Sequence, residues 1–313
     1  MRVFVLVPTR ARPDDLLRCL RALDAQTLRP DGVVVVARPD DKATSDALGA
    51  ARFEAFRPVL VPVALPGQVA ALNEGLAQVR RLKADVVAIT DDDAAPRPDW
   101  CARIAAHFEA NPAIAGVGGR DWLHSPDGGV DCGEMPVVGK VQWFGRVIGG
   151  HQRGVGNARS VDVLKGVNMS FRLSAIEGLQ FDERLRGSGA QIFNDYAFSL
   201  AVRARGGRLI FDPQVAVDHY PGARAEGQPR LGRSADAVAE AAHNETLALT
   251  TFLRGPRAAV FIGWAILVGS RLAPGLLVAI KLRLGGHDGA WRLLRASIAA
   301  RWAARSRAQS VGR

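Results

Sequence analysis

The chain has 313 residues, of which 48% are hydrophobic, so a disordered protein is excluded and one large α/β domain, or a domain with an appendage, is expected. Its formal net charge of +10 is concentrated at the carboxyl end, where residues 281–313 hold eight Lys and Arg but only one acid. A basic terminal segment beside apolar stretches is typical of proteins that meet an anionic membrane surface. Nucleic-acid binding is not expected, because it favours a basic stripe on the folded domain.

The cysteines and the N-terminus indicate the compartment. Cys19, Cys101 and Cys132 are widely spaced and form no Cys-x-x-Cys pair that could hold zinc. The N-terminal apolar run of about six residues is too short for the core of a signal peptide and has the pattern of a buried strand. We therefore expect a reduced, cytoplasmic chain.

Strands and helices alternate over the first part of the chain. Apolar runs at 3–7, 33–36 and 85–90 have the length and Val/Ile content of buried strands. Pro13 opens a segment with leucines at helical spacing, and 68–81 has the pattern of a second helix. This order predicts an α/β fold with a Rossmann-like, mostly parallel sheet flanked by helices. Ligands bind such sheets beyond the carboxyl ends of the strands.

After Gly119 the chain becomes richer in glycine and loops. We expect apolar elements at 161–164 and 167–171, a helix at 194–205, and a pair of strands at 206–220. Residues 222–233, rich in Gly, Arg and Gln, predict a mobile loop, and a helix is expected at 235–253. The shifts in composition suggest three regions, 1–119, 120–222 and 223–313.

The most apolar stretch lies at 258–280. Arg271 and Pro274 interrupt it after about thirteen residues, short of the roughly twenty that span a bilayer. Beyond it, Trp, Leu and Ile alternate with arginines over 291–305, the composition of an interfacial amphipathic helix. We expect a C-terminal helical appendage that attaches to the membrane without a clean span. The alternative is a helical hairpin packed on the domain.

Polar residues stand directly after the expected strands: Pro8, Thr9 and Arg10, then Asp40 and Asp41, then Asp91, Asp92 and Asp93. Because alternate residues of an extended chain point to the same side, Asp91 and Asp93 can converge while Asp92 points away. Two convergent carboxylates suit Mg²⁺ or Mn²⁺, and such an ion would relieve their mutual repulsion. Alternatively, the acids cap or solvate the loop that follows.

Several segments, in this order, resemble inverting family 2 glycosyltransferases, which have a GT-A fold. The first half contains "VLVPTRARPDDLLRCLRALDAQTL", "VVVVARPDD", "PGQVAALNEGL" and "DVVAITDDDAAPRPDW". In the second half, "LKGVNMSFR" and "GSGAQIFNDYAFSLAVRARGGRLIFDP" are similar to the acceptor-side segments of that family. The resemblance covers residues 3–220. It implies a nucleotide-sugar-binding half, 1–119, and an acceptor-binding half, 120–222.

The resemblance implies roles for polar residues of the first half. Asp91 would contact the ribose or phosphate, and Asp93 would ligate the metal bridging the diphosphate, a Lewis acid for leaving-group departure. Asp40 or Asp41, with Asp41 favoured, would contact the base. The implied nucleotide-sugar-binding set is Pro8, Thr9, Arg10, Asp40, Asp41, Asn73, Asp91 and Asp92.

Asp195 aligns with the family's general base, which takes the proton of the acceptor hydroxyl on the face opposite the leaving group. Its place at a helix start also suits the helix macrodipole. His219 would complete the metal shell, or be a hydrogen-bonded structural histidine. The implied acceptor-side residues are His151, Lys165, Gly166, Asn168 and Asn194. The alternative for His151 is a surface-loop histidine. Gly166 has no side chain and would allow close approach of the backbone. Trp122, Trp143 and Phe144 offer sugar-stacking faces, although core packing is the commoner use of such residues.

Departures from the family pattern narrow the expected function. "RPDDK" replaces the usual Asp-Asp-Gly-Ser, Leu72 stands where an Arg commonly precedes Asn73, and Asn194-Asp195 replaces Glu-Asp. No Gln-x-x-Arg-Trp motif follows, so single addition is expected rather than processive synthesis. The sequence thus predicts an inverting, metal-dependent transferase that moves one sugar from a nucleoside-diphosphate sugar to a glycan or lipid-linked, cell-envelope acceptor at the cytoplasmic membrane face.

Two alternatives remain. A sugar-1-phosphate nucleotidyltransferase would be expected to carry a Gly-rich phosphate signature after the first strand, and "PTRARPDD" lacks the glycines. A non-catalytic nucleotide-sugar-binding membrane protein would not need Asp195 as a base.

Overall fold

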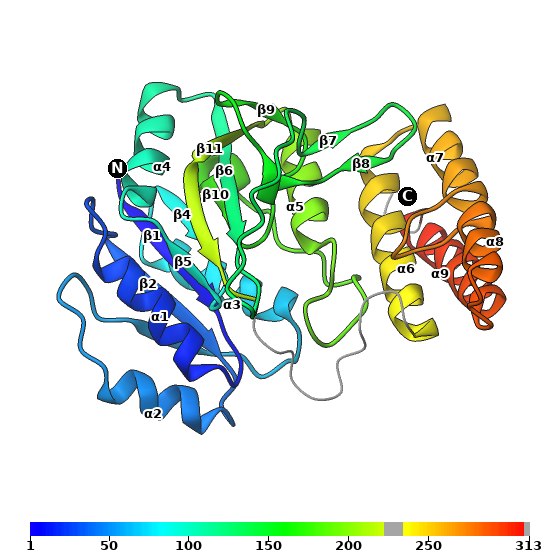
Figure 1. Cartoon of the computed structure of the whole chain (residues 1–313). Coiled ribbons are helices and arrows are strands. Elements are labelled where there is room, and N and C mark those ends of the chain that lie inside the picture. Colours follow the sequence, from blue (N-terminus) through cyan, green and yellow to red (C-terminus); the bar gives the residue numbers. More distant parts are fainter. Residues whose placement is uncertain (222–233, 310–313) are drawn as a thin grey trace.

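A computed structural model describes residues 1–221 and 234–309 (Figure 1). The predicted mobile loop at 222–233 lies outside the described residues. A nine-stranded sheet forms the centre, in the order β3-β2-β1-β4-β10-β6-β11-β5, and β9 pairs with β11. The strands are β1 (Val3–Pro8), β2 (Gly32–Ala37), β3 (Val59–Pro62), β4 (Val86–Ile89), β5 (Ala94–Pro96), β6 (Ile114–Leu123), β9 (Arg159–Val161), β10 (Met169–Arg172) and β11 (Arg208–His219).

The sheet is parallel at one end and mixed at the other. Strands β1 to β4 pair only in parallel with one another, as the βαβ pattern predicts. Strand β10 runs antiparallel between β4 and β6, and β11 is parallel to β6 but antiparallel to β5 and β9. Strands from both predicted halves, 1–119 and 120–222, therefore share one sheet, and their carboxyl ends can contribute to one site.

Helices cover both faces of this sheet. Along β1, Val3, Val5 and Val7 pack with α1 (Pro13–Asp24) and α4 (Trp100–Ala110) on one face. The alternate residues Phe4 and Leu6 pack with α3 (Gln68–Arg81) and α5 (Asn194–Ala204) on the other. This alternation follows from the two-residue repeat of a strand, and it accounts for an apolar run that is buried throughout. Helix α2 (Lys42–Ala50) lies beside α1.

The predicted strand pair at 206–220 is wrong, because the structure forms one long strand, β11. Its pairing with β6 shifts register between Asp212 and Val217. Pro213 lies within this break and has no backbone N–H to donate to the ladder, so a bulge is the natural place for it. The bulge lets the same strand continue to His219 at the carboxyl edge of the sheet.

The C-terminal part forms a helical unit against α5 (Figure 1). It consists of α6 (Ala235–Phe252), α7 (Pro256–Leu267), α8 (Leu276–Leu284) and α9 (Ala290–Gln309). The hairpin of β7 (Lys140–Val141) and β8 (Val147–Ile148) reaches this unit, where the ring of Phe144 packs at a tilt against Trp264. Short 3₁₀ turns occupy His151–Arg153 and Leu173–Ile176.

Helix α9 differs from the interfacial helix expected at 291–305. Its Leu293, Leu294, Ala300 and Ala304 are buried, and it packs along α6. The apolar residues of α9 thus pack on the domain, whereas its Trp291 and Trp302 are exposed. Within residues 1–221 and 234–309, none of the helices combines the length and the apolar character needed to cross a bilayer.

Candidate active site

The aspartate triplet follows β4 at the carboxyl edge of the parallel strands, where the ends of β1 and β11 also lie. The amino ends of α3 and α5 approach the same corner. The backbone N–H of Val69 in α3 donates to Oε1 of Gln191 at 2.9 Å, and Gln191 belongs to the loop that leads into α5. Two segments more than a hundred residues apart are therefore locked together beside the triplet.

Asp92 is the most deeply buried of the three acids, with an exposed fraction of 1%. The Thr9 hydroxyl donates to its Oδ2 at 2.7 Å, and the Arg12 guanidinium lies 2.9 Å from its Oδ1. Burial raises the pKa of Asp92 to about 7, although Arg12 and Thr9 oppose the shift. Asp92 points away from the surface, as alternation predicts, and it anchors the loops after β1 and β4 to each other.

Asp93 lies between two cationic side chains. Arg12 donates to its Oδ2 at 2.8 Å, and Nε2 of His219 lies 3.4 Å from its Oδ1. The other ring nitrogen of His219 lies 3.3 Å from Oδ2 of Asp121, which is fully buried on β6. Burial would lower the pKa of His219, but its contacts with Asp121 and Asp93 outweigh that effect and raise the pKa to about 9. His219 is therefore a cation at neutral pH in this arrangement.

Arg12 is a site residue that the sequence reasoning missed. It contacts both Asp92 and Asp93, and together with His219 it supplies the positive charge that the triplet requires. The signal was present in "PTRARPDD", where Arg12 follows β1 by four residues, but an arginine beside a helix start has no feature that marks its partner. Asp121 was missed because one acid in the middle of a buried stretch carries no spacing signal.

Asp91 faces the second half of the domain. Gln68 donates to its Oδ1 at 3.2 Å, and Asn194 donates to Oε1 of Gln68 at 3.4 Å. Burial raises the pKa of Asp91 to about 6, and the charges of Asp93 and Asp195 add to the rise. Asp91 is thus close enough to both carboxylates to sense their charge. Gln68 is a second residue that the sequence did not reveal.

Asp195 lies in the first turn of α5. Its Oδ2 accepts the backbone N–H of Gly166 at 3.0 Å, and its Oδ1 accepts the N–H of Tyr196 at 2.9 Å. Burial raises its pKa above the ordinary 3.8, although these two hydrogen bonds and the charge of Lys165 oppose the rise. A half-buried carboxylate with a raised pKa at the edge of the site can act as a proton acceptor.

The family comparison agrees with this geometry. The model of the family described as "Glycosyltransferase like family 2" matches residues 1–232, about three quarters of the chain. The chain belongs to this glycosyltransferase family.

Relatives of known identity are more distant. Over 147 residues the chain is 28% identical to a glucosyl-dolichyl phosphate glucuronosyltransferase of Haloferax volcanii, and this match covers 43% of the chain and 42% of that relative. The chain therefore spans less than half the length of this relative.

Solved glycosyltransferase structures share the fold. A mannosyltransferase from Pyrobaculum calidifontis, in complex with GDP-Man and Mn²⁺, has a TM-score of 0.51 at 18% identity, covering 98% of this chain and 87% of its own. TarS 1-349 of S. aureus, in complex with UDP-GlcNAc, has a TM-score of 0.54 at 14% identity, covering 98% and 92%. The GT-A-type fold is thus confirmed.

The spacing of possible ligand atoms shows whether a metal ion would fit at the carboxylates. Nε2 of His219 and Oδ1 of Asp93 face each other at 3.4 Å. Neighbouring ligands of an octahedral ion with bonds of about 2.1 Å lie about 3 Å apart, so this pair fits a shared divalent ion once His219 has lost its Nε2 proton. No set of three or more His, Cys, Asp or Glu with metal-binding geometry occurs among the described residues, so substrate phosphates and water would complete the shell.

The two acids after β2 have different surroundings. Asp41 caps α2, where it accepts the N–H and hydroxyl of Thr44, and it also accepts the N–H of Ala11 at 2.6 Å. Burial would raise its pKa, but these hydrogen bonds outweigh burial and lower it. The side chain of Asp40 is 73% exposed. The carboxylate of Asp41 is thus engaged in capping, whereas Asp40 is exposed and lies 3.5 Å from Nε of Arg38.

Two residues that the sequence assigned to the site, Asn73 and Asn168, form hydrogen bonds with backbone groups of neighbouring segments. Asn73 exchanges hydrogen bonds with the backbone of Phe181 at 2.8 and 3.0 Å. Asn168 is buried between Nε1 of Trp100 and the carbonyl of Val215. The structure does not bring Asn73 or Asn168 to the carboxylates.

His151 is also structural. It is buried, and its Nε2 contacts the Val163 carbonyl at 3.0 Å. Burial lowers its pKa to about 4, so the ring is neutral. His151 is therefore not an exposed loop histidine, and its ring is near enough to Asp121 for that charge to oppose the effect of burial.

Other predicted residues do reach the site. Pro8 and Thr9 are buried at the end of β1, and Arg10 is exposed beside them. Lys165 pairs with Asp121, and Gly166 holds Asp195 through its N–H. A Cβ at Gly166 would lie 3.7 Å from Cβ of Asp195, an ordinary contact, so packing against Asp195 does not by itself require glycine there.

The predicted stacking residues are dispersed. Trp122 lies between the guanidinium groups of Arg97 and Arg120, whose carbons are 4.9 and 3.5 Å from its ring centre. Trp143 is 64% exposed near α7, and Phe144 packs on Trp264. Of the three, Trp143 and Phe144 belong to the β7–β8 hairpin, away from the carboxylates.

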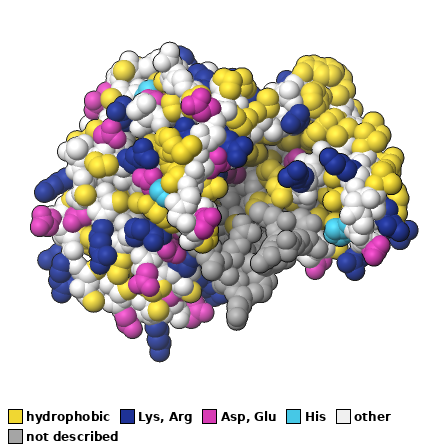
Figure 2. Space-filling view, in the orientation of Figure 1, with side chains coloured by type: hydrophobic (Ala, Val, Ile, Leu, Met, Phe, Trp, Pro, Cys, Tyr) yellow, Lys and Arg dark blue, Asp and Glu magenta, His cyan; other side chains and the backbone are white. Residues whose placement is uncertain are grey.

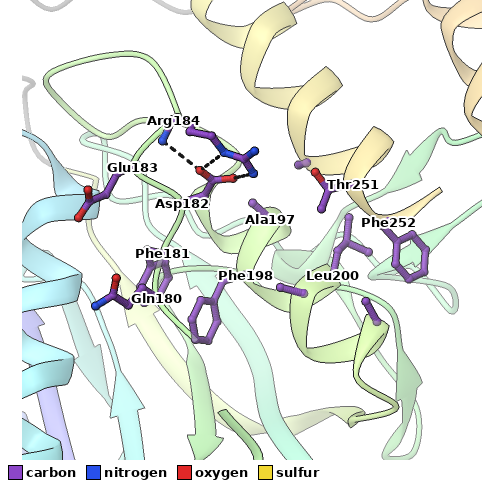
Figure 3. Close-up of a pocket in the computed structure, with 13 residues that line it drawn as sticks. Gln180, Phe181, Asp182, Glu183, Arg184, Ala197, Phe198, Leu200, Thr251 and Phe252 are labelled. Atoms are coloured by element: carbon purple, nitrogen blue, oxygen red, sulfur yellow. Dashed lines mark hydrogen bonds and ion pairs between the residues drawn. The ribbon is translucent and has the colours of Figure 1, made fainter. Parts of the chain in front are cut away.

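A cavity of about 390 Å³ lies elsewhere, between α5, α6 and residues 180–184 (Figure 3). Its lining includes Phe181, Phe198 and Phe252, together with Asp182 and Arg184, which form an ion pair at 2.7 Å. None of the triplet aspartates lines it, and neither does Asp195. We therefore place the candidate active site at the carboxylates, outside this cavity.

Proposed function

We propose that the protein transfers a single sugar from a nucleoside-diphosphate sugar to an acceptor hydroxyl, with inversion at the anomeric carbon. The observation that carries this proposal is the pairing of two different carboxylate environments at one corner. The triplet is surrounded by Arg12 and His219, whereas Asp195 is fixed by backbone N–H groups and lies near enough to raise the pKa of Asp91. One cluster suits a leaving diphosphate and the other suits an incoming hydroxyl.

In the proposed reaction, Asp195 takes the proton of the acceptor hydroxyl as its oxygen forms a bond to the anomeric carbon. The bond from that carbon to the diphosphate oxygen breaks on the opposite face, and the electron pair leaves with the nucleoside diphosphate. Arg12 lies where it can stabilise the negative charge that develops on the leaving group. Attack and departure on opposite faces give inversion.

Asp93 and His219 would hold a divalent ion, with His219 in its neutral form after loss of the Nε2 proton, and Asp91 would contact the nucleotide. Such an ion supplies Lewis-acid stabilisation of the departing diphosphate. The Mn²⁺ in the Pyrobaculum mannosyltransferase supports this proposal. The hydrogen bond from Thr9 to Asp92 would hold the loop after β1 in place beneath the bound donor.

We assign the base contact to Asp40, with Arg10 at the rim of the same pocket. The support is exposure, since Asp40 is exposed and Asp41 is engaged in capping. Lys165 and Asn194 would contact the acceptor. In support, the charge of Lys165 acts on Asp195, and Asn194 directly precedes Asp195 in α5.

The acceptor in this proposal is a lipid-linked or cell-envelope glycan, met at the cytoplasmic face of the membrane. The archaeal relative supports a lipid-linked acceptor, since its name gives a dolichyl-phosphate sugar as the substrate. The basic, apolar C-terminal segment is consistent with work near a membrane.

Two measurements test the proposal. First, a thermal-shift screen of nucleoside diphosphates with and without Mn²⁺ should show one base that raises the unfolding midpoint, and more strongly with the metal. Second, donor hydrolysis or transfer should fall at least about a hundredfold in Asp93→Ala and in Asp195→Asn. Asp127→Asn, on an exposed turn, is the matched control and should retain wild-type turnover.

The two variants separate the roles. Asp195→Asn should keep donor affinity and lose turnover, whereas Asp93→Ala should lose the metal-dependent part of donor affinity. Unchanged turnover in both variants would refute the proposal. Pyrophosphate release from a nucleoside triphosphate and a sugar phosphate would instead identify a nucleotidyltransferase, and tight donor binding without any product would identify a non-catalytic binding protein.

A further inference from the structure

Helix α8 turns an apolar face to solvent. Leu276, Leu277, Ile280 and Leu284 are 39%, 50%, 37% and 84% exposed, and the one buried residue of the helix is Ala279. Leu267, at the end of α7, adds a further exposed leucine at 52%. Figure 2 shows hydrophobic side chains gathered over this C-terminal end of the molecule. These five residues are called the α8 face below. Aliphatic side chains this exposed and this close in sequence indicate an interaction surface.

Cations border the α8 face. Arg271, Lys281 and Arg283 are exposed on or beside α8. Across residues 246–309, Asp288 is the only acid, and it lies 3.4 Å from Arg283. The surface is therefore apolar with a positive border. Apolar side chains flanked by Lys and Arg match the layered chemistry of a bilayer whose head groups are anionic.

We infer that the α8 face docks on the surface of an anionic lipid bilayer. Leucines and Ile280 would enter the boundary between head groups and acyl chains, and Lys281 and Arg283 would contact lipid phosphates. The helices lie on the bilayer and do not cross it, because α7 has 12 residues and α8 has 9, against the roughly twenty that a span requires.

Charge argues for lipid over a second copy of the chain. A symmetric dimer through the α8 face would bring Lys281, Arg283 and Arg271 of both copies together, and like charges at an interface oppose association. An anionic bilayer has the opposite charge. The surface also differs from the helix that the sequence suggested, since α9 buries its leucines against α6 and α8 carries the exposed ones.

This inference does not depend on sugar transfer, because binding to vesicles needs no donor or acceptor. The test uses the full-length protein in co-sedimentation with vesicles of phosphatidylcholine alone or with about 30% phosphatidylglycerol. We expect clear binding to the anionic vesicles, weak binding to the neutral ones, and a loss of binding as the salt concentration rises.

Two pairs of variants separate the apolar and the charged contributions. Leu277→Glu with Leu284→Glu should weaken binding to anionic vesicles at least about tenfold, because it removes apolar contacts and adds negative charge. Lys281→Gln with Arg283→Gln should weaken it about thirtyfold, the effect of two lost phosphate contacts. Leu28 and Arg29 are exposed between α1 and β2, so Leu28→Glu and Arg29→Gln are matched controls that should bind as the wild type does.

Several results would overturn the inference. Equal binding of the wild type to neutral and anionic vesicles would remove the role of charge, and wild-type binding by the Leu277→Glu/Leu284→Glu variant would remove the α8 face. A dimer in light scattering that this variant dissociates, together with no vesicle binding, would assign the face to self-association. Thermal unfolding of each variant confirms that it is folded, since all the altered side chains are exposed.

Discussion

Arg301 gives the sharpest stability prediction. It lies in α9 with an exposed fraction of 2%, and its guanidinium donates to Oε2 of Glu245 at 2.7 Å, to Oγ1 of Thr246 at 2.9 Å and to the carbonyl of Ala273 at 3.2 Å. These bonds join α6 and α9 to the turn that precedes α8. Replacing Arg301 by Met keeps the aliphatic stem but leaves the carboxylate of Glu245 buried without its partner.

The expected cost is that of breaking a buried ion pair, about 3–5 kcal/mol. For a chain of this size each kcal/mol lowers the melting temperature by about 2–4 °C, so Arg301→Met should melt roughly 10 °C lower. The double variant Glu245→Leu/Arg301→Met should recover most of the loss, because no charge then stays buried. The Ala273 carbonyl keeps a partner in that variant, since it also accepts the N–H of Ser270 at 3.0 Å.

Urea unfolding followed by circular dichroism measures both variants. The exposed pair of Arg283 and Asp288 provides the comparison, and Arg283→Gln should leave stability nearly unchanged. The reasoning fails if Arg301→Met loses less than about 1 kcal/mol, or if the double variant is as unstable as the single one. The first result would mean that the unpaired Glu245 finds water, and the second that Arg301 acts through packing alone.

Three further predictions concern packing, positioning and pH. Gly75→Ala in α3 should lose about 1–3 kcal/mol in chemical denaturation, because a Cβ there would lie 2.1 Å from Cδ1 of Leu6, whereas Gly49→Ala in α2, with nothing within 4 Å, should gain about 0.5–1 kcal/mol. Asn244→Ala removes the side-chain amide bonds that fasten the loop before α5, so kcat should fall about tenfold or more while the donor Kd holds, and equal losses in both would contradict a positioning role. Because burial raises the pKa of Asp195, kcat/KM should decline on acidification at a higher pH than an ordinary carboxyl of pKa 3.8 would give, and a pH–rate profile with its acid limb at or below that value would refute this.

The sequence predicted the elements of the fold well where one periodicity dominated. The helix expected at 68–81 is α3 with the same bounds, and the strand at 3–7 is β1 extended by Pro8. In both, local pattern and burial agree, so neither needs a distant partner to be recognised. The sequence pattern was wrong at 206–220, where it predicted two strands. The break around Pro213 looks like a turn in sequence but is a bulge within the single strand β11. The sequence left two readings of α9 open, because leucines interleaved with arginines look the same in sequence whether the helix packs on α6 or on lipid.

The site was predictable in position but only partly in its members. Rows of acids after a buried strand point to the carboxyl edge of the sheet, and Asp91, Asp92 and Asp93 do lie there. Asp41 and Asp40 look alike in sequence, and that Asp41 caps α2 depends on which side chain turns inward. Arg12 could not be found from spacing, because its contacts with Asp92 and Asp93 cross 80 residues of sequence and depend on the fold to form.

Adjacent aspartates in this chain have separate surroundings, and that separation explains how three like charges fit after one strand. Asp92 turns inward to Thr9 and Arg12, Asp93 lies between Arg12 and His219, and Asp91 turns toward Gln68. Asp91 is connected to α5, the helix that carries Asp195, through the hydrogen bonds from Gln68 and Asn194. A change at Gln68 should therefore alter the coupling between donor binding and the Asp195 helix without disturbing the Arg12 pairs. Gln68→Ala should leave thermal stability nearly unchanged and lower turnover with donor bound, whereas Arg12→Ala should lower both, because it uncovers two buried carboxylates at once.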